Sequence, residues 1–184
     1  MKKAPPRVDP HQDHAVQFYR DDAALMTTLS RFVREGLIAG QPVLVIATPE
    51  HRGQLAAQLL KDGMTPDSFE KGGTLWLLDA RETLESFMDG AKPDPARFHN
   101  VIGDLLRTAH GGRGPVRAYG EMVDLLWKAG QAEAAIRLEM LWNRLATTHH
   151  FMLLCGYCIG SFYKQAGRFD IGDVCGQHAR VLPA

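Results

Sequence analysis

The 184-residue chain lacks the features that mark several special classes of protein. It has three cysteines, an odd number that argues against a disulfide framework and makes a reducing cytoplasm the expected location. Its 21 Lys and Arg residues balance 21 Asp and Glu residues, so no excess charge favours nucleic acid or an anionic membrane. No apolar run approaches the roughly 20 residues of a membrane span, and none follows the N-terminal lysines as in a secretory signal. The composition therefore predicts a globular cytoplasmic protein.

Motifs of nucleotide binding and of nucleophilic catalysis are missing as well. Neither GxxxxGK[ST] nor GxGxxG occurs, and the turn after the first expected strand is Tyr-Arg-Asp-Asp (19–22), with two acids and no glycine. Ser161 lies in CIGSF and not in a GxSxG elbow. Glu121 and Glu139 could pair for acid–base chemistry, but structural roles for such acids are more frequent. We therefore expect no bound nucleotide and no enzymatic activity.

Segments with the patterns of strands and helices alternate from His14 onwards. Residues 42–47 (PVLVIA) are continuously apolar, which is typical of a strand covered on both faces, and Thr48-Pro49 begins a helix directly after it. We predict one α/β domain over residues 14–184, with a mostly parallel sheet of five to six strands and helices on both faces. Residues 1–13, polar and rich in proline, are expected to be a disordered lead-in. The expected strands are residues 14–19, 42–47, 74–78, 115–119, 150–157 and 180–182.

Polar and aromatic side chains follow several of these strands, at the edge where a parallel sheet binds its ligands. Most residues in such positions only cap helices or close turns, so the rule selects candidates and does not define a site. The densest group of acids, tryptophans and cysteines lies between Pro115 and Cys158. The residues that follow strands are Tyr19, Arg20, Thr48, Asp79, Gly120, Glu121, Tyr157 and Cys158.

Three cysteines and a histidine have a spacing that occurs in metal sites. Cys155, Cys158, Cys175 and His178 form the pattern C-x2-C-x16-C-x2-H, which is in the range of structural zinc sites. However, the first two lie on or just past a strand, where residues three apart do not point the same way. The same cysteines could also be buried apolar residues or a redox pair.

Several motifs together resemble one known family. They are HAVQFYRDD (14–22), GQPVLVIATPEHR (40–52), LLDARETLESFM (77–88), VRAYGEMVDLLWKAG (116–130), RLEMLWNRLA (137–146) and LLCGY (153–157). In this order they resemble the MEDS sensory domain, which is found in dichloromethane-responsive regulators and in many bacterial histidine kinases. The resemblance extends from about His14 to the C-terminus. It also implies a RecA/KaiC-like fold without a phosphate (Walker A) loop, in agreement with the missing glycines.

The resemblance implies a signal-sensing domain of a bacterial regulatory system and not an enzyme. The family is proposed to recognise small hydrocarbon derivatives. Its members are usually fused to an output domain, and none follows Ala184, so we expect a stand-alone sensor that homo-oligomerises or contacts a histidine kinase or other regulator. The family pattern corresponds to His14, Phe18, Tyr19, Arg117, Gly120, Glu121, Trp127, Glu139, Trp142, Cys155, Tyr157, Cys175 and His178; Cys158 departs from it.

From these positions we predict a site for a small, largely apolar ligand at the carboxyl ends of the strands. The predicted aromatic walls are Tyr19, Trp127, Trp142 and Tyr157, and the predicted orienting groups are Arg117, Glu121 and Glu139. Core packing of both tryptophans is the competing interpretation. No cofactor is required, although a metal ion could bind His14, Cys155, Cys175 and His178. A metal- or redox-responsive sensor that uses these four residues, and a ligand-free adaptor, are the alternative functions.

Overall fold

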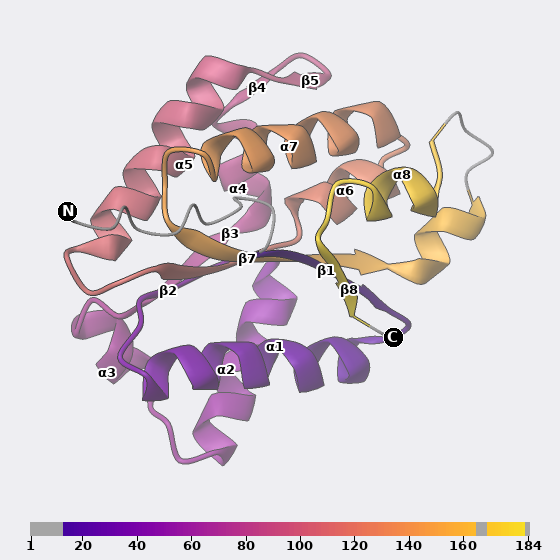
Figure 1. Ribbon diagram of the computed structural model, residues 1–184. Coiled ribbons are helices and arrows are strands. Elements are labelled where there is room, and N and C mark those ends of the chain that lie inside the picture. The colour runs from indigo at the N-terminus through magenta and orange to yellow at the C-terminus, as the bar shows by residue number, and fades with distance from the viewer. Residues whose placement is uncertain (1–12, 165–168, 183–184) are drawn as a thin grey trace, which may run out of the picture.

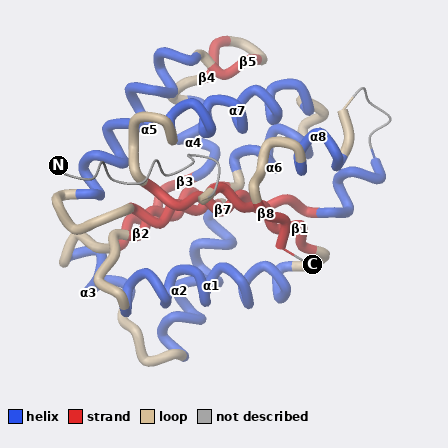
Figure 2. The backbone as a smooth tube through the Cα atoms, in the orientation of Figure 1, coloured by secondary structure: helices blue, strands red, loops and turns tan. Residues whose placement is uncertain are grey.

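The computed structural model describes residues 13–164 and 169–182, which form a six-stranded sheet between two layers of helices (Figure 1, Figure 2). All neighbouring strands are parallel, in the order β3-β2-β6-β7-β1-β8. The predicted fold class is confirmed. The strands are β1 (His14–Tyr19), β2 (Val43–Ala47), β3 (Leu75–Asp79), β6 (Val116–Gly120), β7 (Phe151–Cys158) and β8 (Arg180–Leu182).

Helices cover both faces of this sheet, as Figure 1 shows. One layer contains α1 (Asp22–Ile38), α2 (Pro49–Lys61) and α3 (Pro66–Lys71). The other contains α4 (Ala80–Glu85), α5 (Pro95–His110), α6 (Met122–Lys128), α7 (Ala132–Leu145) and α8 (Ile171–Cys175), and the 3-10 helix η1 (Ile159–Lys164) contributes to its core. Within the described ranges, no helix combines the length and the apolar character that crossing a membrane would need.

The helices α1, α2 and α5 each begin at a residue whose side chain accepts a free backbone N–H group, whereas α7 begins without such a cap. The Asp21 carboxylate accepts the N–H of Ala24 at 2.9 Å at the start of α1, and Asp94 has the same role at the start of α5. Thr48 caps α2, with Pro49 in the first helical position. α5 ends at Gly111, whose φ of 44° is left-handed. The starts of these three helices, including the one predicted at Thr48-Pro49, therefore follow from local capping.

The side chains of each central strand alternate between the two layers, because successive residues of a strand point to opposite faces. On β1, Phe18 belongs to the core beneath α5–α7, whereas Tyr19 belongs to the core beneath α1 and α2. On β7, Cys155 and Tyr157 belong to the first core and Leu154 to the second. This alternation decides which candidate residues can meet.

Four short elements were not predicted from the sequence. They are α3, α8 and the two-residue strands β4 (Met88–Asp89) and β5 (Lys92–Pro93), which pair antiparallel. Each is too short for hydrophobic periodicity to identify. The expected short helix after β7 is the 3-10 helix η1. The predicted lead-in lies outside the described residues except for Asp13.

We predict that Gly156→Ala lowers the free energy of unfolding by about 1–3 kcal/mol, because it overpacks the core. A Cβ at Gly156 would lie 2.5 Å from the hydroxyl of Tyr119, which is buried and donates to Glu121. Urea denaturation measures the change. Gly53→Ala on the exposed side of α2 is the control, because its Cβ would meet open space, and helix propensity predicts a gain of up to about 1 kcal/mol. Equal stability of the two variants would contradict the packing role of Gly156.

Candidate functional site

Four side chains of metal-ligating type converge between the sheet and α7. His14 is the first residue of β1, Cys155 lies in the neighbouring strand β7, and both point to the α7 side. Glu139 lies on the buried face of α7, and His178 follows α8. One nitrogen, sulfur or oxygen atom from each residue lies within 4.8 Å of the others. We call these four residues the His-Glu-Cys-His cluster.

The Glu139 carboxylate lies at the centre of this cluster. Its Oε2 is 3.3 Å from His14 Nε2 and 3.4 Å from Cys155 Sγ. Its Oε1 is 3.4 Å from His178 Nε2 and accepts a hydrogen bond from the Tyr157 hydroxyl at 2.9 Å. The His14 Nε2 is also 3.4 Å from Cys155 Sγ. Among the described residues, His178 Nε2 has no hydrogen-bond partner.

Neighbouring acceptors fix the orientation of both imidazole rings. His14 Nδ1 lies 2.8 Å from Asn143 Oδ1, and Asn143 Nδ2 donates to the Gln177 carbonyl at 3.0 Å, which sets the direction of the amide. His178 Nδ1 lies 2.7 Å from the Val174 carbonyl. Because both partners only accept, each Nδ1 carries a proton and each Nε2 faces the carboxylate.

The electrostatics of the cluster are those of a buried ion network. Burial alone would raise the pKa of Glu139, but the neighbouring His178 and His14 hold it well below its ordinary value. Burial lowers the pKa of His178, and the adjacent carboxylate more than offsets this and raises it. Burial, reinforced by Glu139, raises the pKa of the Cys155 thiol. Such a thiol does not have the lowered pKa of a reactive nucleophile.

The other two cysteines are not part of this cluster. Of the four predicted metal ligands, His14, Cys155 and His178 come together, and Glu139 takes the fourth place. Cys175 lies half-buried on α8, and Cys158 packs with the core on the α1 side of the sheet. A pair of Cys155 and Cys158 is not formed, because the two side chains lie on opposite faces of the sheet.

A second buried carboxylate, Glu121, follows β6 and faces α2. Its Oε1 accepts the backbone N–H of Thr48 at 2.5 Å. Its Oε2 accepts the Tyr119 hydroxyl at 3.0 Å and lies 2.7 Å from His51 Nδ1. The other ring nitrogen of His51 is 3.3 Å from Asp22. Glu121 is thus held by three donors and is engaged in the structure of this edge of the sheet.

Tyr19, a predicted wall residue, belongs to a neighbouring polar network. Its hydroxyl donates to Asp124 Oδ2 at 3.1 Å, and Lys128 Nζ lies 2.7 Å from the same oxygen. The other oxygen of Asp124 accepts the backbone N–H of Cys158 at 3.1 Å. Asp124 therefore joins the ends of β1 and β7 to α6.

Trp127 and Tyr157, two further predicted wall residues, lie together in an aromatic group at the carboxyl ends of β1 and β7. Their ring centroids are 6.0 Å apart in an edge-to-face arrangement. Phe162 of η1 packs 4.4 Å from Trp127 and 5.7 Å from Tyr157, and Phe18 lies 5.6 Å from Phe162. We call these four residues the aromatic cluster.

The remaining predicted ligand residues lie elsewhere. Trp142 packs edge-to-face on Phe98 at 5.2 Å, within the core between α5 and α7. Arg117 faces α1, where its guanidinium donates to Gln41 Oε1 at 2.8 Å and to the Phe32 carbonyl at 3.0 Å. The seven predicted ligand residues are therefore distributed over several places and do not line a single crevice.

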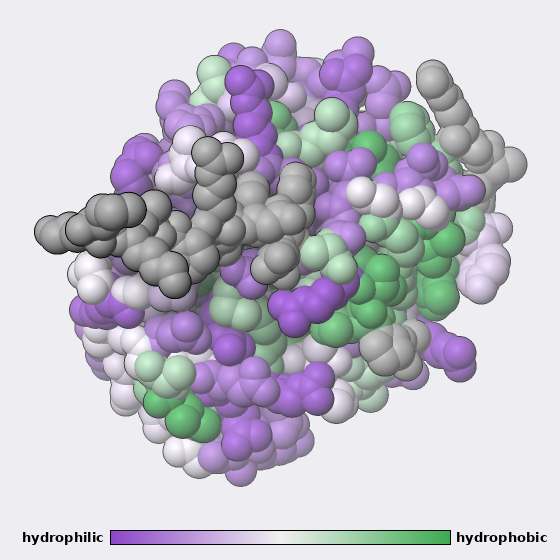
Figure 3. Space-filling model, viewed as in Figure 1, coloured by the Kyte–Doolittle hydropathy of each residue, from purple (hydrophilic) through white to green (hydrophobic). Residues whose placement is uncertain are grey.

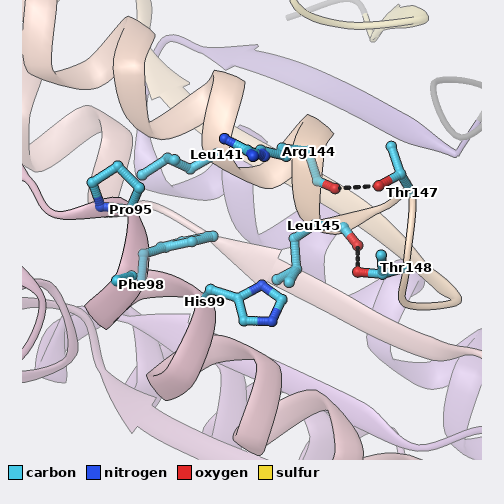
Figure 4. Close-up of a pocket in the computed structure, with 9 residues that line it drawn as sticks. Pro95, Phe98, His99, Leu141, Arg144, Leu145, Thr147 and Thr148 are labelled. Atoms are coloured by element: carbon cyan, nitrogen blue, oxygen red, sulfur yellow. Dashed lines mark hydrogen bonds between the residues drawn. The ribbon is translucent and has the colours of Figure 1, made fainter.

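Two open pockets lie apart from these clusters. One of about 450 Å³ lies between α5 and the end of α7, with Phe98, His99, Leu141 and Arg144 in its lining (Figure 4). Another of about 270 Å³ lies between α1 and the sheet, and Arg117 contributes to its lining. Trp142 lies behind the first pocket through its contact with Phe98.

Comparison with models of protein families identifies the chain over most of its length. Residues 13–179 match the model of MEDS, the MEthanogen/methylotroph, DcmR Sensory domain. The chain belongs to the MEDS family. The resemblance predicted from the sequence is confirmed, and a sensory role follows for this MEDS domain from the family it belongs to.

The fold of the MEDS domain is also found among solved structures. It is similar to a KaiC-like protein from the hyperthermophilic archaeon Pyrococcus horikoshii OT3, with a TM-score of 0.56 and 11% sequence identity. The similarity covers 94% of this chain and 73% of the archaeal chain. At this identity it concerns the fold alone, and it confirms the predicted RecA/KaiC-like architecture. No curated protein matches the chain.

Sequence reasoning missed several residues that complete these networks. His51 was a detectable candidate, because it lies in the first turn of the helix after β2 and so faces the edge that carries Glu121. Asn143 lies one turn of α7 after Glu139, in the family motif LWN. Phe162 had no such signal, since its role depends on the path of η1 over the sheet.

The stability of the MEDS domain should depend on pH through His51 and Glu121. The hydrogen bond to Glu121 raises the pKa of His51 against burial, and Asp22 adds to this effect. Burial would raise the pKa of Glu121, but His51 and the Thr48 N–H lower it. The contribution of His51 is complete below about pH 6.5 and is lost as pH rises through its raised pKa, whereas that of Glu121 is lost as pH falls through its lowered pKa.

We therefore predict that stability falls as pH rises above about 6.5 and through the raised pKa of His51, and that His51→Gln makes this fall smaller. Urea denaturation at a series of pH values measures the difference between the two proteins. His150→Gln, at an exposed position, is the matched control and should keep the slope of the wild-type protein. Identical slopes for His51→Gln and the wild type would show that His51 does not carry the charge.

Proposed function

We propose that this MEDS domain senses a small, largely apolar hydrocarbon derivative and transmits the signal through protein contacts, without catalysis. The observation that carries the proposal is the aromatic cluster, in which three buried rings are covered by the half-buried Phe162. The cluster lies at the carboxyl ends of β1 and β7, where α/β sheets bind their ligands. Membership of a sensory family supports the general role.

Phe162 is the residue that a ligand would displace. It lies on η1, a six-residue 3-10 helix, and such helices have poorer hydrogen-bond geometry than α-helices. Its neighbour Tyr163 is 83% exposed, so this end of η1 has few contacts with the core. Moving Phe162 therefore costs less free energy than moving Trp127 or Tyr157, which are almost fully buried.

The chemistry of the aromatic cluster suits an apolar ligand. Ring faces bind such molecules through dispersion and burial of apolar area. The hydroxyl of Tyr157 already donates to Glu139, so its ring and not its polar group faces Phe162 and Trp127. On the face in Figure 3, hydrophobic residues gather at the right of the view, over β8 and η1. An apolar ligand would approach the cluster across this surface.

A nucleotide fits this edge of the sheet less well. Asp22, Glu121 and Asp124 lie at the ends of β1 and β6 and would repel phosphates. The backbone N–H groups that begin α1 and α2 already bind Asp21 and Thr48. These contacts support the expectation that the domain does not hydrolyse or bind a nucleotide.

In this proposal, the domain transmits its signal through a contact with another protein at the edge of the sheet that β8 forms. Displacement of Phe162 would shift η1, which precedes α8 and β8 in the chain. β8 is an edge strand, and edge strands offer free backbone groups to a second chain. A histidine kinase, another regulator or a second copy of the domain would be the partner in this proposal.

Tryptophan fluorescence tests the position of the ligand. In a double variant with Trp76→Phe and Trp142→Phe, the only remaining tryptophan is Trp127 in the aromatic cluster. In a second double variant with Trp76→Phe and Trp127→Phe, the only remaining tryptophan is Trp142, behind the pocket of Figure 4. We predict that dichloromethane and larger chlorinated alkanes quench Trp127 saturably and leave Trp142 unchanged, because a ligand in the cluster contacts only the first ring.

Two further variants of the Trp127 reporter sharpen this test. Phe162→Ala removes the ring to be displaced and should tighten binding, as a dry apolar cavity binds small apolar molecules. Leu141→Ala in the pocket of Figure 4 is the control and should leave the titration unchanged. Saturable quenching of Trp142 alone would move the site to that pocket. Quenching of neither ring would favour the ligand-free adaptor.

A further inference from the structure

The His-Glu-Cys-His cluster has the composition of a metal centre, and we propose that it binds one Zn²⁺ ion. Thiolate sulfur, imidazole nitrogen and carboxylate oxygen are the ligands that zinc takes in proteins. Mg²⁺ and Ca²⁺ prefer oxygen ligands alone, so a set with one sulfur and two nitrogens selects a transition metal. This proposal is independent of the aromatic cluster and of any hydrocarbon ligand.

The distances between the ligand atoms agree with tetrahedral coordination. Zinc bonds of about 2.0–2.3 Å place neighbouring ligand atoms about 3.3–3.8 Å apart on the edges of a tetrahedron. His14 Nε2 lies 3.3 Å from Glu139 Oε2 and 3.4 Å from Cys155 Sγ. Cys155 Sγ lies 3.4 Å from Glu139 Oε2. His178 Nε2 lies 3.4 Å from the other oxygen of Glu139. All four ligand atoms lie within 4.8 Å of one another, so coordination of one ion requires the set to contract around it.

The hydrogen bonds around the cluster orient the ligands for a metal. Metal-binding histidines usually donate their second ring nitrogen to a carbonyl or carboxylate, which turns the free lone pair toward the ion. Asn143 Oδ1 and the Val174 carbonyl accept in this way from His14 and His178. The Nε2 atom of His178 is buried and, among the described residues, makes no hydrogen bond. A metal ion would bind this atom directly, whereas its present contact is with Glu139 Oε1 at 3.4 Å.

Charge balance also favours a divalent ion. Once Cys155 is deprotonated by metal binding, Glu139 and Cys155 would carry two negative charges in a site whose side chains are almost completely buried. One Zn²⁺ with two neutral imidazoles makes the centre neutral, and binding releases the thiol proton to solvent. Without a metal, one protonated imidazole would balance the carboxylate while Cys155 stays a neutral thiol, and this ion network is the competing arrangement.

The four ligands belong to four separate parts of the fold. β1, α7 and β7 supply three of them, and His178 lies between α8 and β8. Four protein ligands leave no open position, which is typical of structural zinc sites. The proposed ion would therefore tie the segment from α8 to β8, the last part of the described chain, onto the sheet.

Cobalt substitution tests this proposal on the full chain. The protein is treated with a chelator, and Co²⁺ and then Zn²⁺ are added while absorbance is recorded. We expect one Co²⁺ per chain, with visible absorption of a tetrahedral ion and a near-ultraviolet band from a single thiolate. Stoichiometric zinc should displace both signals and raise the melting temperature. Because this measurement uses the wild-type protein, it does not depend on whether a variant folds.

Variants of the three cysteines and of Asn143 identify the ligands. Cys155→Ser should abolish the thiolate band and lower zinc affinity by about 100-fold, whereas Cys158→Ser and Cys175→Ser are matched controls that should retain both. Asn143→Ala should keep the spectrum and lower affinity by about 10-fold, because it only orients His14. Circular dichroism confirms that each variant is folded.

Two outcomes would overturn the proposal. Absence of one-to-one cobalt binding, with a melting temperature insensitive to zinc, would leave the cluster as a metal-free ion network. Loss of the thiolate band in Cys175→Ser but not in Cys155→Ser would place the metal on other ligands. Neither outcome bears on the quenching of Trp127, so failure of this proposal and failure of the ligand proposal can be distinguished.

Discussion

The buried carboxylate of Glu139 is the constraint on which one half of the structure depends. A charged group with 0% exposure is stable in a protein only if hydrogen-bonding and oppositely charged groups surround it. His14, Tyr157 and His178 are those groups, and they come from the two ends of the described chain and from its central strands. The last segment must therefore return to the sheet after η1, and the pairing of β8 with β1 holds it there.

The hydroxyl of Tyr157 connects the two proposed sites. Its ring forms one wall of the aromatic cluster, and its oxygen donates to Glu139 in the His-Glu-Cys-His cluster. In the proposed function, a molecule that displaces Phe162 would contact this ring, and a rotation of the ring would change the hydrogen bonding of the carboxylate.

Much of the fold, and less of the site, could be predicted from the sequence. Buried strands such as residues 42–47 and capped helix starts such as Thr48-Pro49 are local patterns, so β2 and the start of α2 were predicted within one or two residues. The convergence of Cys155 with Glu139 depends instead on the crossing of α7 over the sheet. The placement of Phe162 depends on a short 3-10 helix without periodicity. Residue types could be predicted, whereas their partners are set by tertiary packing.

Side chains of this chain bind N–H groups at the starts of α1 and α2. In proteins with a phosphate-binding loop, phosphates satisfy such groups. Here the chain supplies its own anions: Asp21 accepts at the start of α1, and Glu121 accepts the N–H of Thr48 at the start of α2. Because Glu121 is held in turn by His51 and Tyr119, the anion is permanent. In the proposed function, recognition beside this edge depends on apolar surface, which the aromatic cluster provides.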